Sequence, residues 1–299
     1  MFPTLFSLNG IELHTWGLLV MLAFLGAAAV TSLRAPRVGI DPDKLVPMYL
    51  IAMGAGLVGA RVLHFAMSTD VDVLREEGLL AFFDPAKGGF AFYGGAIGGI
   101  VAGGVYAMAR QISPWKLFDI GAPSIMLGLA IGRLGCFSAG CCHGLAIAAK
   151  ETGTLLPFPH GHIATLDGAP YLGLVFESGP GAGVAALTDI PVYPTQLMES
   201  GGAFLLFLVL SWIWKHHRRF DGVVMSAMLL LYAGLRATIE HFRGDDVRGL
   251  HTFGPVTLST SQTVAAAMVL VSLIIVAIRL PQGRAPEQPL RPEAEDGDD

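Results

Sequence analysis

Seven apolar stretches follow one another along the chain, separated by polar or Gly- and Pro-rich segments. Each has about 17 to 22 residues, the length that a helix needs to cross roughly 30 Å of hydrocarbon. They lie near residues 16–33, 45–66, 90–109, 117–137, 196–214, 223–242 and 261–280. The pattern therefore predicts an all-α membrane protein with seven transmembrane helices.

The connections between these stretches alternate in charge. Lysine and arginine gather in every second connection: Arg34, Arg37 and Lys44 follow the first stretch, Arg110 and Lys116 the third, Lys215, Arg218 and Arg219 the fifth, and Arg279 and Arg284 the seventh. Because positively charged short loops remain in the cytoplasm, the N-terminus is predicted to lie outside and the C-terminus in the cytoplasm.

The composition agrees with a membrane protein and excludes other classes. Hydrophobic residues make up 53% of the chain and charged residues 14%, which is too little charge to cover the surface of a soluble protein of this size. No region is basic enough to indicate nucleic-acid binding. The N-terminal residues lack the positive segment and the small-residue cleavage site of a removable signal peptide, so the first stretch is expected to remain as a helix.

One domain, residues 1–280, is expected to contain all seven helices. Within it, residues 138–195 are rich in Gly and Pro and hold no apolar run long enough to span a membrane. We predict that they form a small extracytoplasmic cap or a set of loops. The Pro-rich and acidic residues 281–299 are predicted to be a disordered tail.

The third apolar stretch repeats glycine at Gly95, Gly99 and Gly103. This four-residue spacing puts the glycines on one helix face, where the backbone of another helix can approach closely. We interpret them as a packing face.

The depth of each polar residue follows from the helical rise of 1.5 Å per residue. On this basis, polar residues of six predicted helices fall at one depth, near the outer side of the membrane. They are His14 and Trp16, Arg61, Tyr93, Arg133, Gln196 and Glu199, and Arg236 and Glu240. Asp119, at the inner start of the fourth helix, is the exception and is interpreted as a cap of that helix. An arginine is costly in hydrocarbon and usually faces a polar cavity, so Arg133 is the first functional candidate.

The charges at this depth allow structural and functional interpretations. Arg236 and Glu240 stand four residues apart on one helix face, and they either pair with each other or bind a ligand. A pairing of Glu199 with Arg61 is one alternative. Arg133 either reaches the outer headgroups or binds an anion. Three arginines against two glutamates leave room for an added anion, and a phospholipid headgroup is the anion available at that depth.

All three cysteines of the chain, Cys136, Cys141 and Cys142, lie close together in the sequence. With His143 they offer ligands for zinc, but their spacing lacks the paired CxxC of a structural zinc site. A disulfide from Cys136 to Cys141 or Cys142 is a second alternative. Packing as small apolar side chains is the favoured interpretation.

Six motifs are distributed over most of the chain: LHTWGLL at residues 13–19, VGARVLHF, GGFAFYGG, DIGAPSIMLGLAIGRLGCF, YPTQLMES and YAGLRATIEHFRGDD. Together they resemble the motifs of the prolipoprotein diacylglyceryl transferases, seven-helix enzymes of bacterial inner membranes with the N-terminus outside. The resemblance implies transfer of the diacylglyceryl group of phosphatidylglycerol to the lipobox cysteine thiol of a prolipoprotein, with release of glycerol phosphate. No cofactor and no metal ion are expected.

The resemblance also implies roles for single residues. Arg133 matches the arginine of the GRxGNF signature that binds phosphatidylglycerol, and Arg61 is expected to help bind this lipid. Arg236 matches the essential arginine of the sixth helix, and a fixed cation there suits the departing phosphate. Tyr93 and Glu240, followed by His143, are the candidates for the base that takes the thiol proton. Further matched positions are Asp119, Gly144, Gln196, Glu199 and Tyr232.

The chain departs from the family pattern beside the expected headgroup site. Tyr93 stands where the family has histidine, and Cys136 stands where it has asparagine. Ala139, Gly140 and Cys141 replace the family's Asn-Gly-Glu. The acceptor therefore stays open, and the alternatives are a related transferase with another acceptor, a non-catalytic lipid-binding protein and a thiol oxidoreductase that uses the three cysteines.

Overall fold

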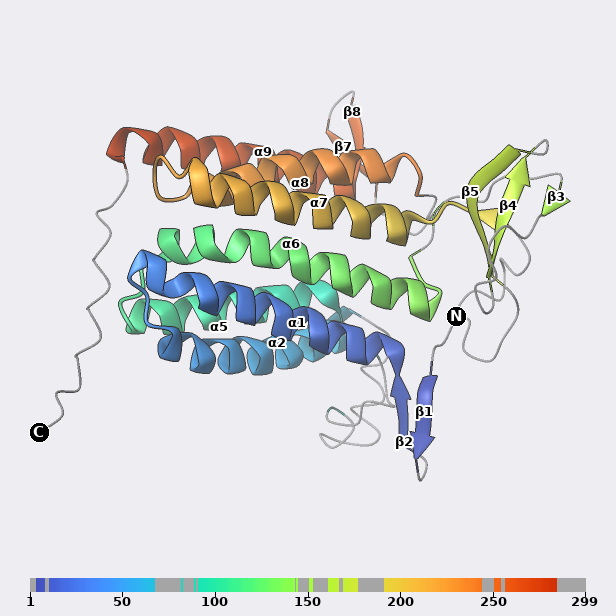
Figure 1. The fold of residues 1–299 in the computed structure, drawn as a ribbon, viewed down its shortest axis with the longest axis horizontal. Helices are drawn as coiled ribbons and strands as arrows, with labels where there is room; N and C mark the ends of the chain where they lie inside the picture. The colour runs from blue at the N-terminus through green and yellow to red at the C-terminus, as the bar shows by residue number, and fades with distance from the viewer. Residues whose placement is uncertain are drawn as a thin grey trace, which may run out of the picture. The chain divides into compact units, whose positions relative to one another are not determined.

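The computed structural model describes residues 4–8, 11–67, 82, 89, 91–142, 144, 151–152, 161–166, 169–176, 191–243, 250–253 and 256–283. Among these residues the main elements are the long helices α1 (Thr15–Arg34), α2 (Leu45–Met67), α5 (Phe92–Ala109), α6 (Pro114–Ala139), α7 (Thr195–His216), α8 (Val223–Glu240) and α9 (Thr260–Arg279) (Figure 1). Short 3-10 helices are η1 (Ala35–Val38), η2 (Pro42–Lys44) and η4 (Leu280–Gln282). Every long helix begins and ends within three residues of a predicted stretch, which confirms the all-α membrane architecture.

The described helices have the surface of a membrane protein. Six are long and apolar enough to cross a bilayer, and α5 supplies a shorter apolar helix, Tyr93–Ala109. Large apolar side chains on their flanks are exposed, such as Ile100 on α5 at 71% and Leu205 on α7 at 62%, whereas Asp119 and Glu199 are buried. This is the reverse of the distribution in soluble proteins, so the protein is a multi-pass membrane protein.

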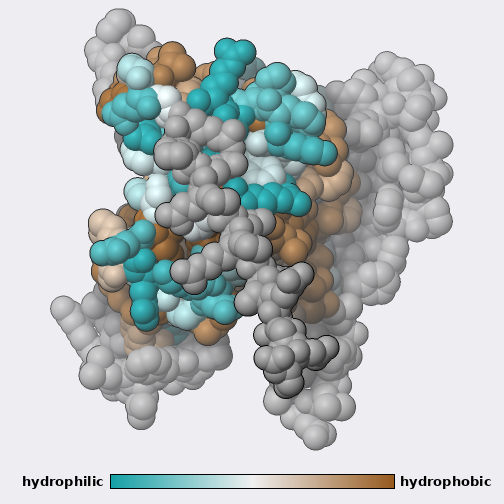
Figure 2. All heavy atoms as spheres, turned by 60° about the vertical axis from the view of Figure 1, so that its left-hand side comes forward, coloured by the Kyte–Doolittle hydropathy of each residue, from teal (hydrophilic) through white to brown (hydrophobic). Residues whose placement is uncertain are grey.

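The residues at the helix ends are more polar than those on the sides of the helices. Figure 2 brings forward the end at which α7 passes into α8 and at which α9 finishes. Hydrophilic residues gather on this face, and hydrophobic residues lie behind them along the helices. The α7–α8 turn contains Arg218, Arg219 and Asp221. Such polar ends with apolar sides suit helices whose ends reach water.

Short antiparallel strands accompany the helices, which the sequence did not predict. They are β1 (Thr4–Leu8) with β2 (Ile11–His14), then β3 (Glu151–Thr152), β4 (Gly161–Leu166), β5 (Ala169–Phe176) and β6 (Pro191–Val192) in that spatial order, and β7 (Leu250–Phe253) with β8 (Val256–Ser259). Ile163 pairs with Leu174 between β4 and β5, and His251 pairs with Leu258 between β7 and β8. The β3–β6 sheet lies within the segment 138–195 that was predicted to form a cap or a set of loops.

The chain folds as two compact units. The larger unit comprises Met1–Thr31 and Phe118–Ala285, and the smaller comprises Ser32–Leu117 and Pro286–Asp299. Residues 284–299 lie outside the described residues, so the disordered tail and the division at residue 280 stay predictions.

Glycines join α2 and α5 in the smaller unit. A Cβ atom on Gly95 would lie 3.3 Å from the carbonyl oxygen of Gly56, and one on Gly99 would lie 3.1 Å from that of Ala52. The closest approach is between Gly59 and Gly94, where an added Cβ on either residue would overlap the carbonyl oxygen of the other. The predicted packing face is therefore confirmed, and its tightest point lies on the neighbouring glycines.

Asp119 of α6 caps α8 in the larger unit. Its carboxylate accepts hydrogen bonds from the backbone N–H groups of Gly222 (2.8 Å), Val224 (3.0 Å) and Met225 (3.1 Å). The N-cap residue of α8, Gly222, has no side chain to do this. The interpretation that Asp119 caps its own helix was wrong, because the four orphan N–H groups of a helix start can be satisfied from a different helix.

A buried serine sets the register of α6 against α7. Ser200 donates to the carbonyl oxygen of Ala130 over 2.8 Å. Hydrogen bonds between membrane helices contribute about 0.6 kcal/mol on average, so this bond matters more for position than for stability. Ser200 follows Glu199, and Ala130 precedes Arg133 by about one helical turn. The bond therefore brings Glu199 to the level of Arg133.

Candidate functional site

Polar side chains at the start of α7 face the protein interior. Gln196, Glu199 and Ser200 are spaced three and four residues apart, which puts them on one side of a helix. All three are buried. The opposite side of α7 carries exposed Leu205, Leu208 and Trp212. The sequence of α7 thus directs a carboxylate inward while its apolar face remains available to lipid.

Glu199 lies between two arginines. Its Oε2 atom is 2.9 Å from Nη2 of Arg133 on α6 and 3.5 Å from Nη1 of Arg236 on α8. Its Oε1 atom accepts a hydrogen bond from the hydroxyl of Tyr232 over 3.1 Å. The Glu199 side chain is 1% exposed, against 16% for Arg133 and 15% for Arg236. One buried carboxylate therefore positions two guanidinium groups that remain accessible.

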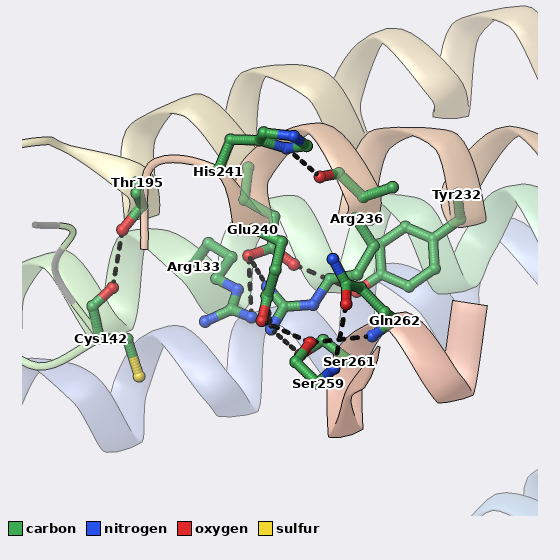
Figure 3. A network of polar contacts seen from close by, with 12 residues as sticks. Arg133, Cys142, Thr195, Tyr232, Arg236, Glu240, His241, Ser259, Ser261 and Gln262 are labelled. Atoms are coloured by element: carbon green, nitrogen blue, oxygen red, sulfur yellow. Dashed lines mark hydrogen bonds and ion pairs between the residues drawn. The ribbon is translucent and has the colours of Figure 1, made fainter. Parts of the chain in front are cut away.

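Tyr232, Arg236 and Glu240 follow one another at four-residue intervals and lie along one face of α8. Nη2 of Arg236 lies 3.5 Å from Oε2 of Glu240, so the ion pair that was one of the sequence interpretations is confirmed. Figure 3 shows the Arg133, Arg236 and Glu240 side chains converging beside Ser259 and Ser261. Three helices and the start of α9 thus contribute to one polar network.

Two serines at the start of α9 complete this network, and sequence reasoning missed them. Ser259 donates from Oγ to Oε1 of Glu240 over 2.9 Å, and Nη2 of Arg236 donates to Oγ of Ser261 over 2.8 Å. Ser259 and Gln262 also form a capping box at the start of α9. The Ser-x-x-Gln spacing was a readable signal for that helix start, but nothing in it indicated contact with α8.

Arg133 keeps a buried donor atom for a further acceptor. Its Nε atom is buried and makes no hydrogen bond within the described part of the chain, whereas Nη1 of Arg236 already faces Oε2 of Glu199 at 3.5 Å. Buried donors normally find acceptors, because an unsatisfied polar group costs about 1–3 kcal/mol. An arginine fork matches the oxygen atoms of a phosphate or carboxylate. The arrangement is therefore suited to binding an oxyanion.

The loop after α6 is attached to the start of α7. Nε2 of Gln196 donates to the carbonyl oxygen of Cys141 (2.8 Å), and Oγ1 of Thr195 donates to that of Cys142 (2.9 Å; Figure 3). Gly144 donates to the carbonyl oxygen of Tyr193 over 2.9 Å. A Cβ atom on Gly144 would overlap the Phe242 carbonyl oxygen, so only glycine fits where this loop crosses the end of α8.

Arg61 and Tyr93, the remaining predicted site residues, belong to the smaller unit. Arg61 is buried, and its guanidinium donates to the carbonyl oxygens of Phe82 (2.9 Å) and Gly89 (3.0 Å). It also lies 4.9 Å from the ring centroid of Phe65. Tyr93 is 59% exposed in the first turn of α5. Their roles in binding and catalysis stay predictions, as does that of His143, which lies outside the described residues.

The comparison with known proteins agrees with the motifs of the sequence. A family model described as prolipoprotein diacylglyceryl transferase matches residues 3–278. Three relatives carry the name phosphatidylglycerol–prolipoprotein diacylglyceryl transferase. They come from Clostridium tetani (27% identical over 278 residues, 91% of this chain and 96% of the relative), Finegoldia magna (28% over 270 residues, 90% and 92%) and Chromohalobacter salexigens (28% over 280 residues, 93% and 93%).

Proposed function

The chain belongs to the prolipoprotein diacylglyceryl transferase family, and we propose that it moves the diacylglyceryl group of phosphatidylglycerol to the lipobox cysteine thiol of a prolipoprotein. It is a transferase of lipoprotein biosynthesis and a multi-pass protein of the bacterial inner membrane. The relatives' names supply the lipid and the protein substrate. The pair of arginines on Glu199 is the observation of this chain that carries the proposal.

The proposed reaction breaks one bond and forms one. The thiol sulfur attacks the glycerol carbon that bears the phosphate, and the carbon–oxygen bond to the phosphate breaks. The products are a thioether and glycerol phosphate, and the thiol proton passes to a base or to water. The phosphodiester has one negative charge and the leaving phosphate monoester develops a second, so fixed cations bind the leaving group more strongly than the substrate.

Each arginine has its own proposed task. Arg133 binds the headgroup phosphate through its planar fork, and Arg236 stabilises the charge on the departing phosphate. Glu199 holds both guanidinium groups in place, because a carboxylate that is buried between them leaves each with one orientation. Arg61 is proposed to help bind the lipid.

The base has two candidates, Glu240 and Tyr93. Glu240 lies beside Arg236 and accepts a hydrogen bond from Ser259. Because a free thiol is already a few per cent thiolate near neutral pH, a weak base suffices. The replacement of the family's histidine by Tyr93 and of its asparagine by Cys136 favours, as a second candidate function, a related transferase with a different acceptor.

The test uses purified protein and phosphatidylglycerol labelled separately in an acyl chain and in the glycerol headgroup. A lipobox peptide is supplied with cysteine, or with serine as the matched control. We expect acyl label on the cysteine peptide alone, together with an equal amount of soluble labelled glycerol phosphate. Headgroup release without peptide labelling would indicate another acceptor. Saturable lipid binding without release of either label would indicate a non-catalytic lipid-binding protein.

A further inference from the structure

The end of α6 brings two cysteines together through its backbone. Gly140 has φ 71°, its N–H donates to the carbonyl oxygen of Phe137 (3.2 Å), and the N–H of Cys141 donates to that of Cys136 (3.1 Å). This pair of hydrogen bonds defines a Schellman motif with Ala139 as the cap residue, and such a motif frequently brings together the side chains of the residue three positions before the cap and of the second residue after it. Those two residues are Cys136 and Cys141.

Cys142 adds a third sulfur to this pair. Its φ of 61° lies in the left-handed region, which residues other than glycine rarely adopt. The conformation is held because Thr195 and Gln196 bind the carbonyl oxygens of Cys142 and Cys141. As a result the three Sγ atoms all lie within 4.8 Å of one another. Among the described residues, these three cysteines are the group of potential metal ligands whose atoms lie close enough together to bind one ion.

Two positive charges act on the sulfur cluster. The guanidinium groups of Arg133 and Arg243 interact electrostatically with the Cys142 thiol. The thiolate is the form of cysteine that binds metals. The cations also offset the negative charge that three thiolates would leave around a monovalent or divalent ion.

We propose that Cys136, Cys141 and Cys142 bind one thiophilic d10 metal ion, Zn²⁺ or Cu⁺. A metal–sulfur distance of about 2.3 Å puts three sulfurs about 4 Å apart around a central ion, which is close to the spacing already present. Soft thiolate ligands select these two ions. Cu⁺ would take the three thiolates alone, and Zn²⁺ would complete its four ligands with water. A disulfide would use only two of the three convergent sulfurs.

The bound ion would act on the loop and not on the transferred group. The loop is already tied to Thr195 and Gln196, one turn before Glu199 on α7. An ion held by both the end of α6 and this loop would fix the loop against α7. The proposal is independent of the proposed transferase activity, because binding and thermal stability can be measured without substrate.

The experiment uses the full-length protein, purified under anaerobic conditions with reductant and then desalted. In one titration Cd²⁺ replaces Zn²⁺ as a spectroscopic probe. In a second titration Cu⁺ is added together with a competing chelator. We expect one ion per chain, a thiolate-to-metal charge-transfer absorption in the ultraviolet and a higher melting temperature. Competition between Zn²⁺ and Cu⁺ identifies the preferred ion. The variants are Cys136→Ser, Cys141→Ser and Cys142→Ser, each expected to weaken binding at least tenfold.

Ser138→Ala is the matched control, because Ser138 lies on the same turn and its hydroxyl donates to the nearby Gly135 carbonyl oxygen at 2.8 Å. It should bind metal like the wild type. The proposal would be overturned if all three thiols react with a thiol reagent and neither ion produces a charge-transfer absorption. So would a disulfide in the anaerobically purified protein, or metal binding that survives all three cysteine substitutions.

Discussion

Arg133 and Glu199 form a direct ion pair, with Nη2 of the arginine 2.9 Å from Oε2 of the glutamate. The carboxylate is 1% exposed and the arginine side chain 16%. The pair uses one terminal nitrogen and leaves the buried Nε atom without a hydrogen-bond acceptor among the described residues. Arg133 is therefore held by the protein in a fixed orientation, which a side chain that merely reaches for headgroups does not require.

Replacement of Arg133 should show whether its planar fork matters. Removing one preorganised donor to the reacting group's charge typically costs about 10²–10³ in rate, so Arg133→Ala should lower the initial rate of phosphatidylglycerol-dependent transfer at least a hundredfold. Arg133→Lys keeps the charge but loses bidentate binding, and we expect a loss of about tenfold or more. Rates are compared in one detergent with Thr238→Ala, an exposed control on α8. Near-wild-type transfer by the lysine variant would refute the fork's role.

Glu199→Gln should uncouple the two arginines while keeping the side-chain shape. Two guanidinium groups would lose their shared counter-ion, and we expect a lower melting temperature and slower transfer. An anionic lipid can replace the missing charge, and a ligand stabilises the form that it binds. Added phosphatidylglycerol should therefore raise the melting temperature of Glu199→Gln more than that of the wild type. An equal rise in both proteins would show that the lipid does not contact these arginines.

Substitution of Asp119 should reduce stability without touching the proposed site. Asp119→Ala leaves three N–H groups of α8 uncapped, which we expect to cost about 2–4 kcal/mol in unfolding free energy. Asp119→Asn keeps one acceptor oxygen, which can serve Val224 and Met225, but its NH2 group cannot accept from Gly222, so it should lose part of that amount. Thermal unfolding in detergent measures both. Nε of Arg218 lies 4.0 Å from the Asp119 carboxylate, so equal losses in the two variants would assign the effect to this charge pair and not to the cap.

The contact between α2 and α5 offers a matched pair of glycine substitutions. Gly59→Ala places a methyl group against the carbonyl oxygen of Gly94, so the two helices must separate, and the melting temperature should fall. Gly54 lies on the same helix with nothing within 4 Å of an added Cβ. Gly54→Ala should be neutral or stabilising by up to about 1 kcal/mol, because alanine suits a helix interior better than glycine. Similar effects of both substitutions would contradict the close approach.

The orientation in the membrane can be tested with reporters. The alternating basic connections predict that a reporter fused after Arg219 lies in the cytoplasm and that one inserted near Asp167 lies outside. Fusions to a phosphatase that is active only outside, and to a fluorescent protein that matures only in the cytoplasm, should give opposite signals at the two positions. The reverse pattern would refute the predicted topology.

The sequence predicted the helices and much of the site because both depend on local patterns. The length of each apolar run determines where a spanning helix can begin and end, so the long helices among the described residues lie close to their expected ranges. Arg236 and Glu240 were predictable as a pair because four residues make about one turn of a helix. Arg133 stood out as a guanidinium in an apolar segment.

The remaining contacts depend on tertiary geometry, which periodicity does not contain. Asp119 accepts hydrogen bonds from backbone N–H groups more than one hundred positions away, and Glu199 pairs with Arg133 and Arg236, whereas a pairing with Arg61 was one alternative from the sequence. The contacts of Ser259 and Ser261 with α8 arise from the way that α9 packs there. The strands β3 and β6 have two residues each, and the longer β4 (GHIATL) and β5 (APYLGLVF) do not alternate strictly between apolar and polar residues, so the sequence pattern did not indicate them.

The cap that α6 supplies to α8 also orders events during synthesis. The carboxylate of Asp119 and its nearest donor, the N–H of Gly222, are 103 residues apart. At a translation rate of about 5–20 residues per second, Asp119 is made roughly 5 to 20 s before that donor. Until then a ribosome-bound intermediate has α6 without the backbone partners of Asp119. The larger unit can therefore complete its core only when the sixth span is inserted, because the three N–H groups that Asp119 binds in the folded protein belong to the start of that span.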